Sequence, residues 1–138
     1  MIQANELRIG NLVLSPNGWH GKVYEIRYDF IEMQYQDEGG DYTFGFDLID
    51  PIPITPEWLE RLGFEKDSIA TEIPVGRDSE YKIKIDKKTL LVAWFNPLEI
   101  ELCHYFSERT TLMDHIKYIH QLQNLFFALT GTELTIKP

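Results

Sequence analysis

The sequence predicts an α+β fold in which a small antiparallel β unit precedes a short helix, a β-meander and one long C-terminal helix. Two observations support this prediction. Apolar residues alternate with a period of two in two separate regions, and the last apolar segment instead follows the period of an α-helix. A proline-rich connector separates the two β regions. We therefore expect one unit over residues 1–50 and a second over residues 51–138.

Residues 5–50 contain four or five short strand patterns separated by turn residues. Pro16-Asn17-Gly18 supplies the first turn, residues 37–41 form an acidic turn, and a strand is expected over residues 42–49, with Tyr42 on its apolar face. Short strands at this spacing favour an SH3-like barrel. The frames Gly10-Asn11-x-Val13 and Gly21-Lys22-Val23 also resemble the start of such barrels, including the KOW-type barrels that bind nucleic acid.

The connector at residues 50–54 is stiff and extended, since each of its two prolines fixes its own φ and disfavours helix at the residue before it. The segment that follows predicts a two-turn helix with well-specified ends. Thr55 is the expected N-cap, Pro56 the first helical residue and Gly63 the residue that ends the helix. Phe64 would then close on Leu59, the contact of a Schellman motif.

From residue 81 the period returns to two in three successive segments, which predict a three-stranded meander. A short strand is also expected near residues 73–75. The long helix is predicted over residues 114–131, with Thr111 and Asp114 at capping-box spacing and Gly131 at its end. Its expected buried face comprises Leu112, Ile116, Tyr118, Ile119, Leu122, Leu125, Phe126, Phe127 and Leu129. Its expected solvent stripe comprises Lys117, Gln121, Asn124 and Ala128.

Composition excludes several classes of protein. The chain has 138 residues, 43% of them hydrophobic, which suffices for a globular core and is too high for a disordered chain. No apolar segment approaches the roughly 20 residues that cross a bilayer, and the start lacks the features of a signal peptide. Cys103 is the single cysteine, which agrees with a reducing compartment. We expect a cytoplasmic protein that does not bind membranes.

The charge is acidic and uneven. The formal net charge is −9, and residues 1–50 contain three basic and nine acidic residues, a net charge of −6. Such a balance repels phosphate backbones at long range, so nucleic-acid binding would require a local basic patch.

The residues that could carry chemistry do not form a recognisable catalytic or metal-binding pattern. Cys103 and His104 are neighbours on a predicted strand and therefore point to opposite faces. His115 and His120 are five residues apart, whereas helical metal ligands are three or four apart. We therefore predict no catalytic residue, metal or other cofactor. Gln123 and His120 lie at the margin of the helix's apolar face. The structural interpretation, favoured over a ligand pocket, is that Gln123 locks the helix to a strand backbone or to the N-terminal unit.

Two surface patches are candidate binding sites. The aromatic candidates in the N-terminal unit are Trp19, Tyr24, Tyr28 and Tyr35. They could form the shallow groove with which SH3-like barrels bind peptides, and core packing accounts for some of the tyrosines. The basic candidates in the first meander hairpin are Lys82, Lys84, Lys87 and Lys88. Glu99 and Glu101 are expected on the same face, where they would neutralise part of this charge.

Three segments resemble a group of uncharacterised small proteins of gut anaerobes and their phages or prophages: NELRIGNLV, IPITPEWLERLGF and IHQLQNLFFALTGTELTI. The resemblance implies a cytoplasmic accessory protein encoded by a phage or other mobile element. No activity is established for the group, so no functional residue is carried over.

The leading functional hypothesis is therefore a non-enzymatic accessory protein that binds a protein partner through the N-terminal aromatic residues. The alternative is nucleic-acid binding through the KOW-like start or the lysines of residues 82–88. An enzyme whose catalytic residues converge from distant positions is the third hypothesis.

Overall fold

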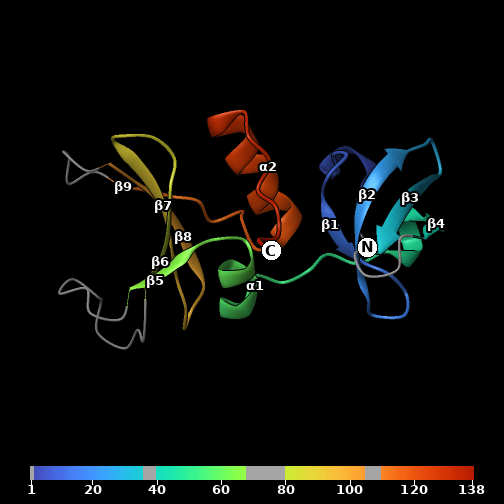
Figure 1. Ribbon diagram of the computed structural model, residues 1–138, viewed down its shortest axis with the longest axis horizontal. Helices are drawn as coiled ribbons and strands as arrows, with labels where there is room; N and C mark the ends of the chain where they lie inside the picture. Colours follow the sequence, from blue (N-terminus) through green and yellow to red (C-terminus); the bar gives the residue numbers. More distant parts are fainter. Residues whose placement is uncertain (1, 36–39, 68–79, 105–109) are drawn as a thin grey trace. The chain divides into compact units, whose positions relative to one another are not determined.

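The computed structural model describes residues 2–35, 40–67, 80–104 and 110–138. The chain divides into two compact units, and Figure 1 labels their elements. The first unit comprises residues 1–53 together with residues 118–125, and the second comprises residues 54–117 together with residues 126–138. The α+β class is confirmed.

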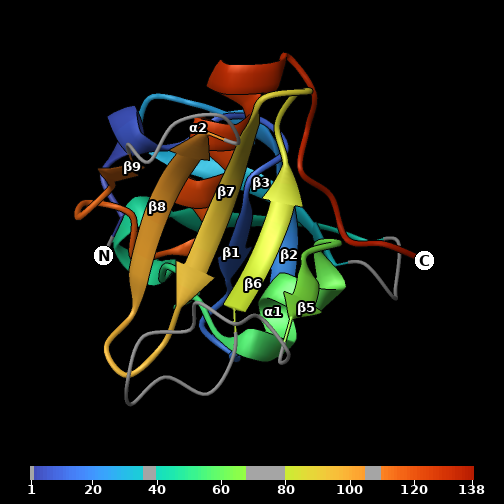
Figure 2. The same cartoon turned by 90° about the vertical axis from the view of Figure 1, so that its left-hand side faces the viewer.

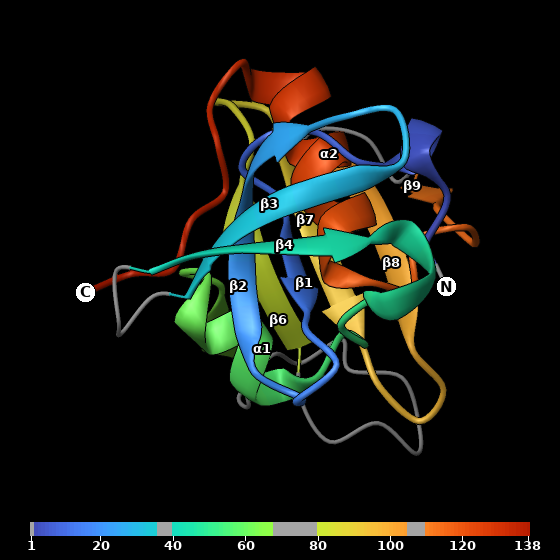
Figure 3. The same ribbon diagram turned by 90° about the vertical axis from the view of Figure 1, so that its right-hand side faces the viewer.

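The first unit contains one four-stranded antiparallel sheet in the order β1-β2-β3-β4 (Figure 3). Its strands are β1 (Leu12–Leu14), β2 (His20–Ile26), β3 (Phe30–Tyr35) and β4 (Asp41–Gly45). Short 3-10 helices, η1 (Ala4–Glu6) and η2 (Phe46–Leu48), lie before β1 and after β4. The strand expected to continue to residue 49 therefore ends at Gly45.

After η2 the chain returns to β1. The Leu14 N–H donates to the Asp50 carbonyl at 2.9 Å, and the Asp50 N–H donates to the Leu14 carbonyl at 3.0 Å. Residues on alternate positions of the strands form the core, and its fully buried members include Val13, Val23, Ile31, Met33 and Ile49. The period-two pattern of the N-terminal region thus marks the buried face of this sheet.

The second unit contains a five-stranded antiparallel sheet in the order β5-β6-β7-β8-β9 (Figure 2). Its strands are β5 (Glu65–Asp67), β6 (Glu80–Lys84), β7 (Thr89–Trp94), β8 (Glu99–His104) and β9 (Thr110–Leu112). The predicted meander is confirmed as β6, β7 and β8. The two added edge strands have three residues each, too few to show a period of two. The strand predicted near residues 73–75 lies outside the described residues.

Helix α1 (Pro56–Arg61) confirms the predicted short helix with both of its ends. The Trp58 N–H donates to the Thr55 hydroxyl at 3.3 Å, which is the N-cap bond. At the other end Gly63 has a φ of 95°. The Phe64 N–H donates to the Leu59 carbonyl at 2.9 Å and the Gly63 N–H to the Glu60 carbonyl at 3.1 Å, the two bonds of a Schellman motif.

Helix α2 (Ile119–Thr130) begins five residues later than the sequence predicts. The expected capping box is wrong because Thr111 belongs to β9, where it pairs with Leu102 of β8. β9 ends at Leu112, and residues 117–119 bond to the backbone of the connector at residues 52–54. The Ile119 N–H donates instead to the Ile52 carbonyl of the connector at 2.8 Å. The predicted C-terminal end is confirmed, since Gly131 has a φ of 73° and follows Thr130 directly.

The predicted faces of α2 are correct only in part. Ile119, Leu122 and Phe126 are buried as expected, whereas Phe127 and Leu129 are exposed. Asn124 was assigned to the solvent stripe, but its side chain makes a network of hydrogen bonds within the first unit. A helical pattern identifies apolar positions, but it does not show which polar side chains find internal partners.

Two adjacent amides of α2, which we call the Gln123–Asn124 clamp, bind the N-terminal segment of the first unit. Gln123 accepts from the Leu12 N–H at 2.8 Å and donates to the Gly10 carbonyl at 3.2 Å. Asn124 accepts from Arg8 at 2.7 Å and from Asn11 at 2.8 Å. The predicted structural role of Gln123 is therefore confirmed.

Replacing Gln123 with leucine should destabilise the protein by about 2–4 kcal/mol, because a buried N–H and a buried carbonyl lose their partner. Urea unfolding followed by circular dichroism measures the change. The control is Leu129→Gln on the exposed side of the same helix, which should change the free energy of unfolding by less than about 0.5 kcal/mol. Equal effects of the two substitutions would contradict the role of the clamp.

Candidate functional site

Three aromatic rings gather at one end of the first sheet. The Trp19 ring meets the Tyr35 ring edge-on at a centroid distance of 5.5 Å, and the Tyr35 and Tyr42 centroids lie 4.5 Å apart. Tyr35 is 6% exposed, whereas Trp19 is 53% and Tyr42 39% exposed. We call these three residues the aromatic ledge: one buried ring supports two rings that remain open to a partner.

Local structure places each ring of the ledge. Trp19 follows the predicted turn, where the Ser15 N–H donates to the Trp19 carbonyl at 2.8 Å and the Gly18 N–H to the Ser15 carbonyl at 2.9 Å. Tyr35 ends β3, opposite Gly21. A Cβ at Gly21 would lie 2.7 Å from the Met33 sulfur, so glycine at this position permits the close packing beneath the ledge.

Tyr42 is not among the binding residues that the sequence predicts. The alternation within β4 assigned it to the apolar face, and the register confirms this by pairing it with buried Met33. Its position at the start of β4, at the end of the sheet, leaves its ring partly exposed. A signal for this was present in the sequence, since Tyr42 directly follows the acidic turn and is the first residue of its strand pattern.

The other two aromatic candidates lie apart from the ledge. Tyr24 occupies the position where the β2–β3 register shifts, and its hydroxyl donates to Glu32 at 2.5 Å. This hydrogen bond is the main cause that raises the pKa of Tyr24 above its ordinary value. Tyr28 is 99% exposed and follows β2, whereas Trp19 precedes it. Of the four candidates, the structure therefore brings together Trp19 and Tyr35.

The charged side chains that neighbour the ledge in sequence lie on the other face of the first sheet. Asp41 directly precedes Tyr42 on β4, so its side chain lies on the opposite face of the strand, where it accepts a hydrogen bond from Gln34 at 3.0 Å. Of the three basic residues among the first fifty, Lys22 shares this outer row with Gln34 and Asp41. The other two have partners elsewhere, Arg8 with Asn124 and Arg27 with Glu25. The surroundings of the ledge thus belong to the most acidic part of the sequence.

The four candidate lysines lie in the β6–β7 hairpin of the second unit. Lys82 and Lys84 are on β6, and Lys87 and Lys88 are exposed in the turn. Asp86 accepts from the Lys88 N–H at 2.7 Å, which lowers the pKa of the Asp86 carboxyl.

The register shows which acids accompany these lysines. Glu65 is directly opposite Lys82. Glu101 shares the face of Lys82, as expected, but Val92 of β7 lies between them in the same row. Glu65 is therefore the nearest cross-strand acid, and the sequence does not predict it because β5 has no periodic pattern.

The cysteine has the properties of an unreactive thiol. Burial, followed by the charges of Glu101 and Glu80, raises the pKa of Cys103 to about 11. The neighbouring His104 instead lies near Thr89, with 3.3 Å between its Nδ1 and the threonine hydroxyl. Within the described ranges, no three histidine, cysteine, aspartate or glutamate side chains are grouped so that they could hold a metal ion.

His120 is as deeply buried as Gln123 but differs from it in its hydrogen bonding. It is 1% exposed, and neither of its ring nitrogens has a hydrogen-bond partner among the residues that the structure describes. A carboxylate oxygen of Glu6 lies 3.9 Å from Nε2. Burial lowers the pKa of His120, and Glu6 opposes part of this effect. The position of His120 therefore favours the neutral ring.

No family model, curated protein or solved structure matches this chain. None of the helices in the described ranges combines the length and apolarity that a bilayer crossing requires.

Burial of His120 predicts a loss of stability in acid. Its pKa is lower in the folded protein than the unfolded value of about 6.5, so the unfolded chain binds the proton more tightly. Stability from this residue is complete above pH 6.5 and is lost as the pH falls below that value. His120→Phe should flatten this part of the stability curve in urea titrations from pH 8 to pH 5. His115→Phe, at an exposed position, should leave the curve unchanged. A curve that His120→Phe does not flatten would contradict the prediction.

The raised pKa of Cys103 predicts slow alkylation. At pH 7.5 iodoacetamide should react with Cys103 at least about tenfold more slowly than with glutathione, because very little thiolate is present. Mass spectrometry of quenched samples measures the rate. The rate should become similar to that of glutathione in 6 M guanidinium chloride, and a fast reaction of the folded protein would contradict the assignment.

Proposed function

We propose that this protein is a non-enzymatic interaction module, and that its N-terminal unit is an SH3-like barrel that binds an extended, positively charged peptide segment of another protein at the aromatic ledge. The observation that carries the proposal is the 53% exposure of Trp19 beside the buried ring of Tyr35. A phage- or prophage-encoded accessory role, as the sequence resemblance implies, is compatible with such a module.

The barrel interpretation is supported by the path of the chain. Four antiparallel strands in sequential order are followed by a return onto the first strand through the Leu14–Asp50 pair. The returning chain hydrogen-bonds to the edge of β1 that faces away from β2. Small barrels remove exposed strand edges in this way.

The chemistry of the ledge supports a peptide partner. Tryptophan and tyrosine provide large rigid surfaces at low entropic cost, and both are enriched among the residues that dominate binding energy. Aromatic-lined surfaces also bind extended, proline-containing segments, whose backbone loses little freedom on docking. Lysine or arginine side chains of such a segment would stack on the exposed rings of the ledge.

The nucleic-acid alternative has less support. Glu65 lies opposite Lys82, and Asp86 lies within the lysine-containing turn, so acids accompany the hairpin's positive charges. The KOW-like start is in the part of the chain with a net charge of −6. Both features oppose a phosphate backbone.

Selection of phage-displayed random 12-residue peptides on the immobilised protein tests the proposal. Selected peptides should be enriched in proline together with lysine or arginine. Trp19→Ala should weaken their binding at least about tenfold, and Tyr42→Ala should weaken it less. Fluorescence anisotropy of labelled peptides measures both affinities.

Tyr28→Ala is the matched control, because Tyr28 is the more exposed aromatic residue but follows β2 at the end remote from Trp19. It should change the affinity by less than about twofold. Selected peptides that are acidic, or that bind Trp19→Ala as tightly as the unmodified protein, would refute the proposed site.

A further inference from the structure

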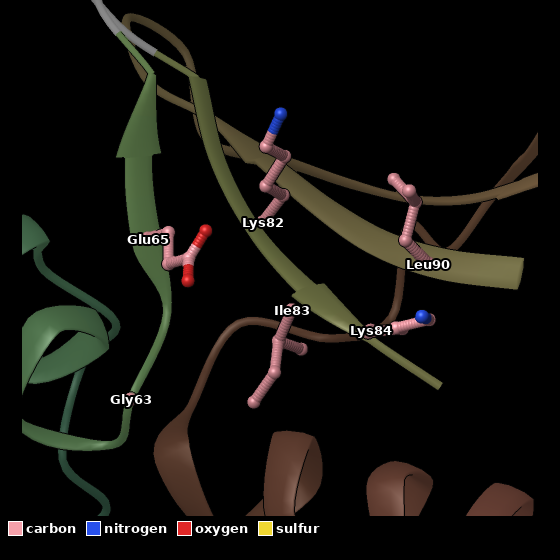
Figure 4. A pocket seen from close by; sticks show the side chains of 6 residues that line it. All are labelled: Gly63, Glu65, Lys82, Ile83, Lys84 and Leu90. Carbon is pink, nitrogen blue, oxygen red and sulfur yellow. The ribbon is translucent and has the colours of Figure 1, made fainter. Parts of the chain in front are cut away.

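The second unit contains a cavity of about 320 Å³ at the edge of its sheet. Figure 4 shows its lining residues, Gly63, Glu65, Lys82, Ile83, Lys84 and Leu90. The Glu65 side chain points from β5 toward β6, and Lys82 and Leu90 project to one side of the sheet while Ile83 projects to the other (Figure 4). The volume falls within the range of about 300–1,000 Å³ that is usual for ligand sites.

The cavity lies where β5 stops short of the end of β6. The ladder between these strands ends at the pair Glu65–Lys82, although β6 continues to Lys84. On the other side of β6, the Ile85 N–H donates to the Thr89 carbonyl at 2.9 Å and so faces β7. Since backbone groups alternate along a strand, the N–H and carbonyl of Lys84 face away from β7, toward the cavity.

The end of helix α1 accounts for the early end of β5. Continuation of the β5–β6 register would place Gly63 opposite Lys84. The N–H groups of Gly63 and Phe64 are instead bonded to helix carbonyls in the Schellman motif. The C-terminal segment also holds this turn in place, since the Lys137 N–H donates to the Arg61 carbonyl at 2.7 Å. The described chain therefore supplies no strand partner for Lys84 on this side.

The charges at this edge specify its occupant. Four of the thirteen basic residues of this acidic protein fall within residues 82–88, and two of them line the cavity. The chain already places a carboxylate opposite one of these two, in the pair Glu65–Lys82. An acid at the next pairing position, opposite Lys84, would repeat that arrangement.

We propose that this cavity binds an extended acidic peptide segment, which adds to β6 as a short strand and places a carboxylate residue opposite Lys84. Strand addition supplies backbone hydrogen bonds, and the lysine side chains supply the preference for acids. This site is separate in sequence and in charge from the aromatic ledge, so it does not depend on the function proposed above.

The test uses the full-length ¹⁵N-labelled protein and a capped hexapeptide of alternating valine and glutamate. Binding should shift the amide signals of Gly63, Glu65 and residues 82–84 in heteronuclear NMR spectra. A residue directly opposite Lys84 exchanges both backbone bonds with it, because the Lys84 amide faces the cavity. N-methylation of the glutamates should therefore abolish binding, and N-methylation of the valines should not.

Two matched variants test the role of the lysine. Lys84→Glu should weaken the binding of the hexapeptide at least about tenfold. Lys87→Glu makes an equal change of charge in the turn and should weaken this binding less than about threefold. Urea unfolding checks that both variants fold. The proposal is overturned if the hexapeptide causes no shifts at 1 mM, if both N-methylated peptides bind equally, or if both variants lose affinity equally. It is also overturned if a 12-base-pair DNA duplex shifts these signals and the hexapeptide does not.

Discussion

Two hydrogen bonds between the Gln123 amide and the backbone of residues 10–12 attach helix α2 to the N-terminal segment of the first unit. The amide offers one acceptor and one donor, and the segment before and within β1 offers a donor and an acceptor in matching positions. A glutamine side chain thus makes the two bonds that a neighbouring strand would make. The Leu12 N–H and the Gly10 carbonyl are largely removed from water. Loss of either hydrogen bond would therefore leave a polar group unpaired, at a cost in folding free energy.

The surrounding polar groups reinforce this contact. Asn11 is fully buried, and its side chain accepts from the Arg8 N–H and donates to Asn124. The Asn124 amide also donates to the Glu6 carbonyl at 2.9 Å. Each of these amides uses both its oxygen and its nitrogen. His120 lies on the same helix and is buried without such partners, so burial alone does not decide whether a polar side chain is satisfied.

The parts of the fold that were predictable from the sequence are those specified by local chemistry. Thr55, Pro56 and Gly63 fixed both ends of α1, and Gly131 fixed the end of α2, because capping depends on residues close in sequence. The predicted start of α2 was wrong because residues 110–112 pair with β8 and residues 117–119 bond to the connector at residues 52–54. Such pairing is a tertiary interaction, and a helical pattern in one segment contains no information about it.

The candidate site was predictable to a similar extent. The place of Trp19 beside the predicted turn made it a candidate, but the contact between Tyr35 and Tyr42 depends on the register of β3 and β4. The cavity beside Lys84 was not predictable, because β5 has only three residues and its pairing with β6 is a tertiary interaction, although the end of α1 follows from local sequence. A site formed by the early end of a strand leaves no motif in the sequence.

The division of the chain between its units has a consequence for synthesis on the ribosome. Residues 118–125 belong to the first unit although they are separated from its other residues by the whole sheet of the second. The buried side chains of Asn11 and its neighbours therefore emerge long before the amides that bind them. In a nascent chain that ends before residue 123, the polar groups of the N-terminal segment can hydrogen-bond only to water. The first segment to be synthesised is therefore among the last to acquire its native hydrogen bonds.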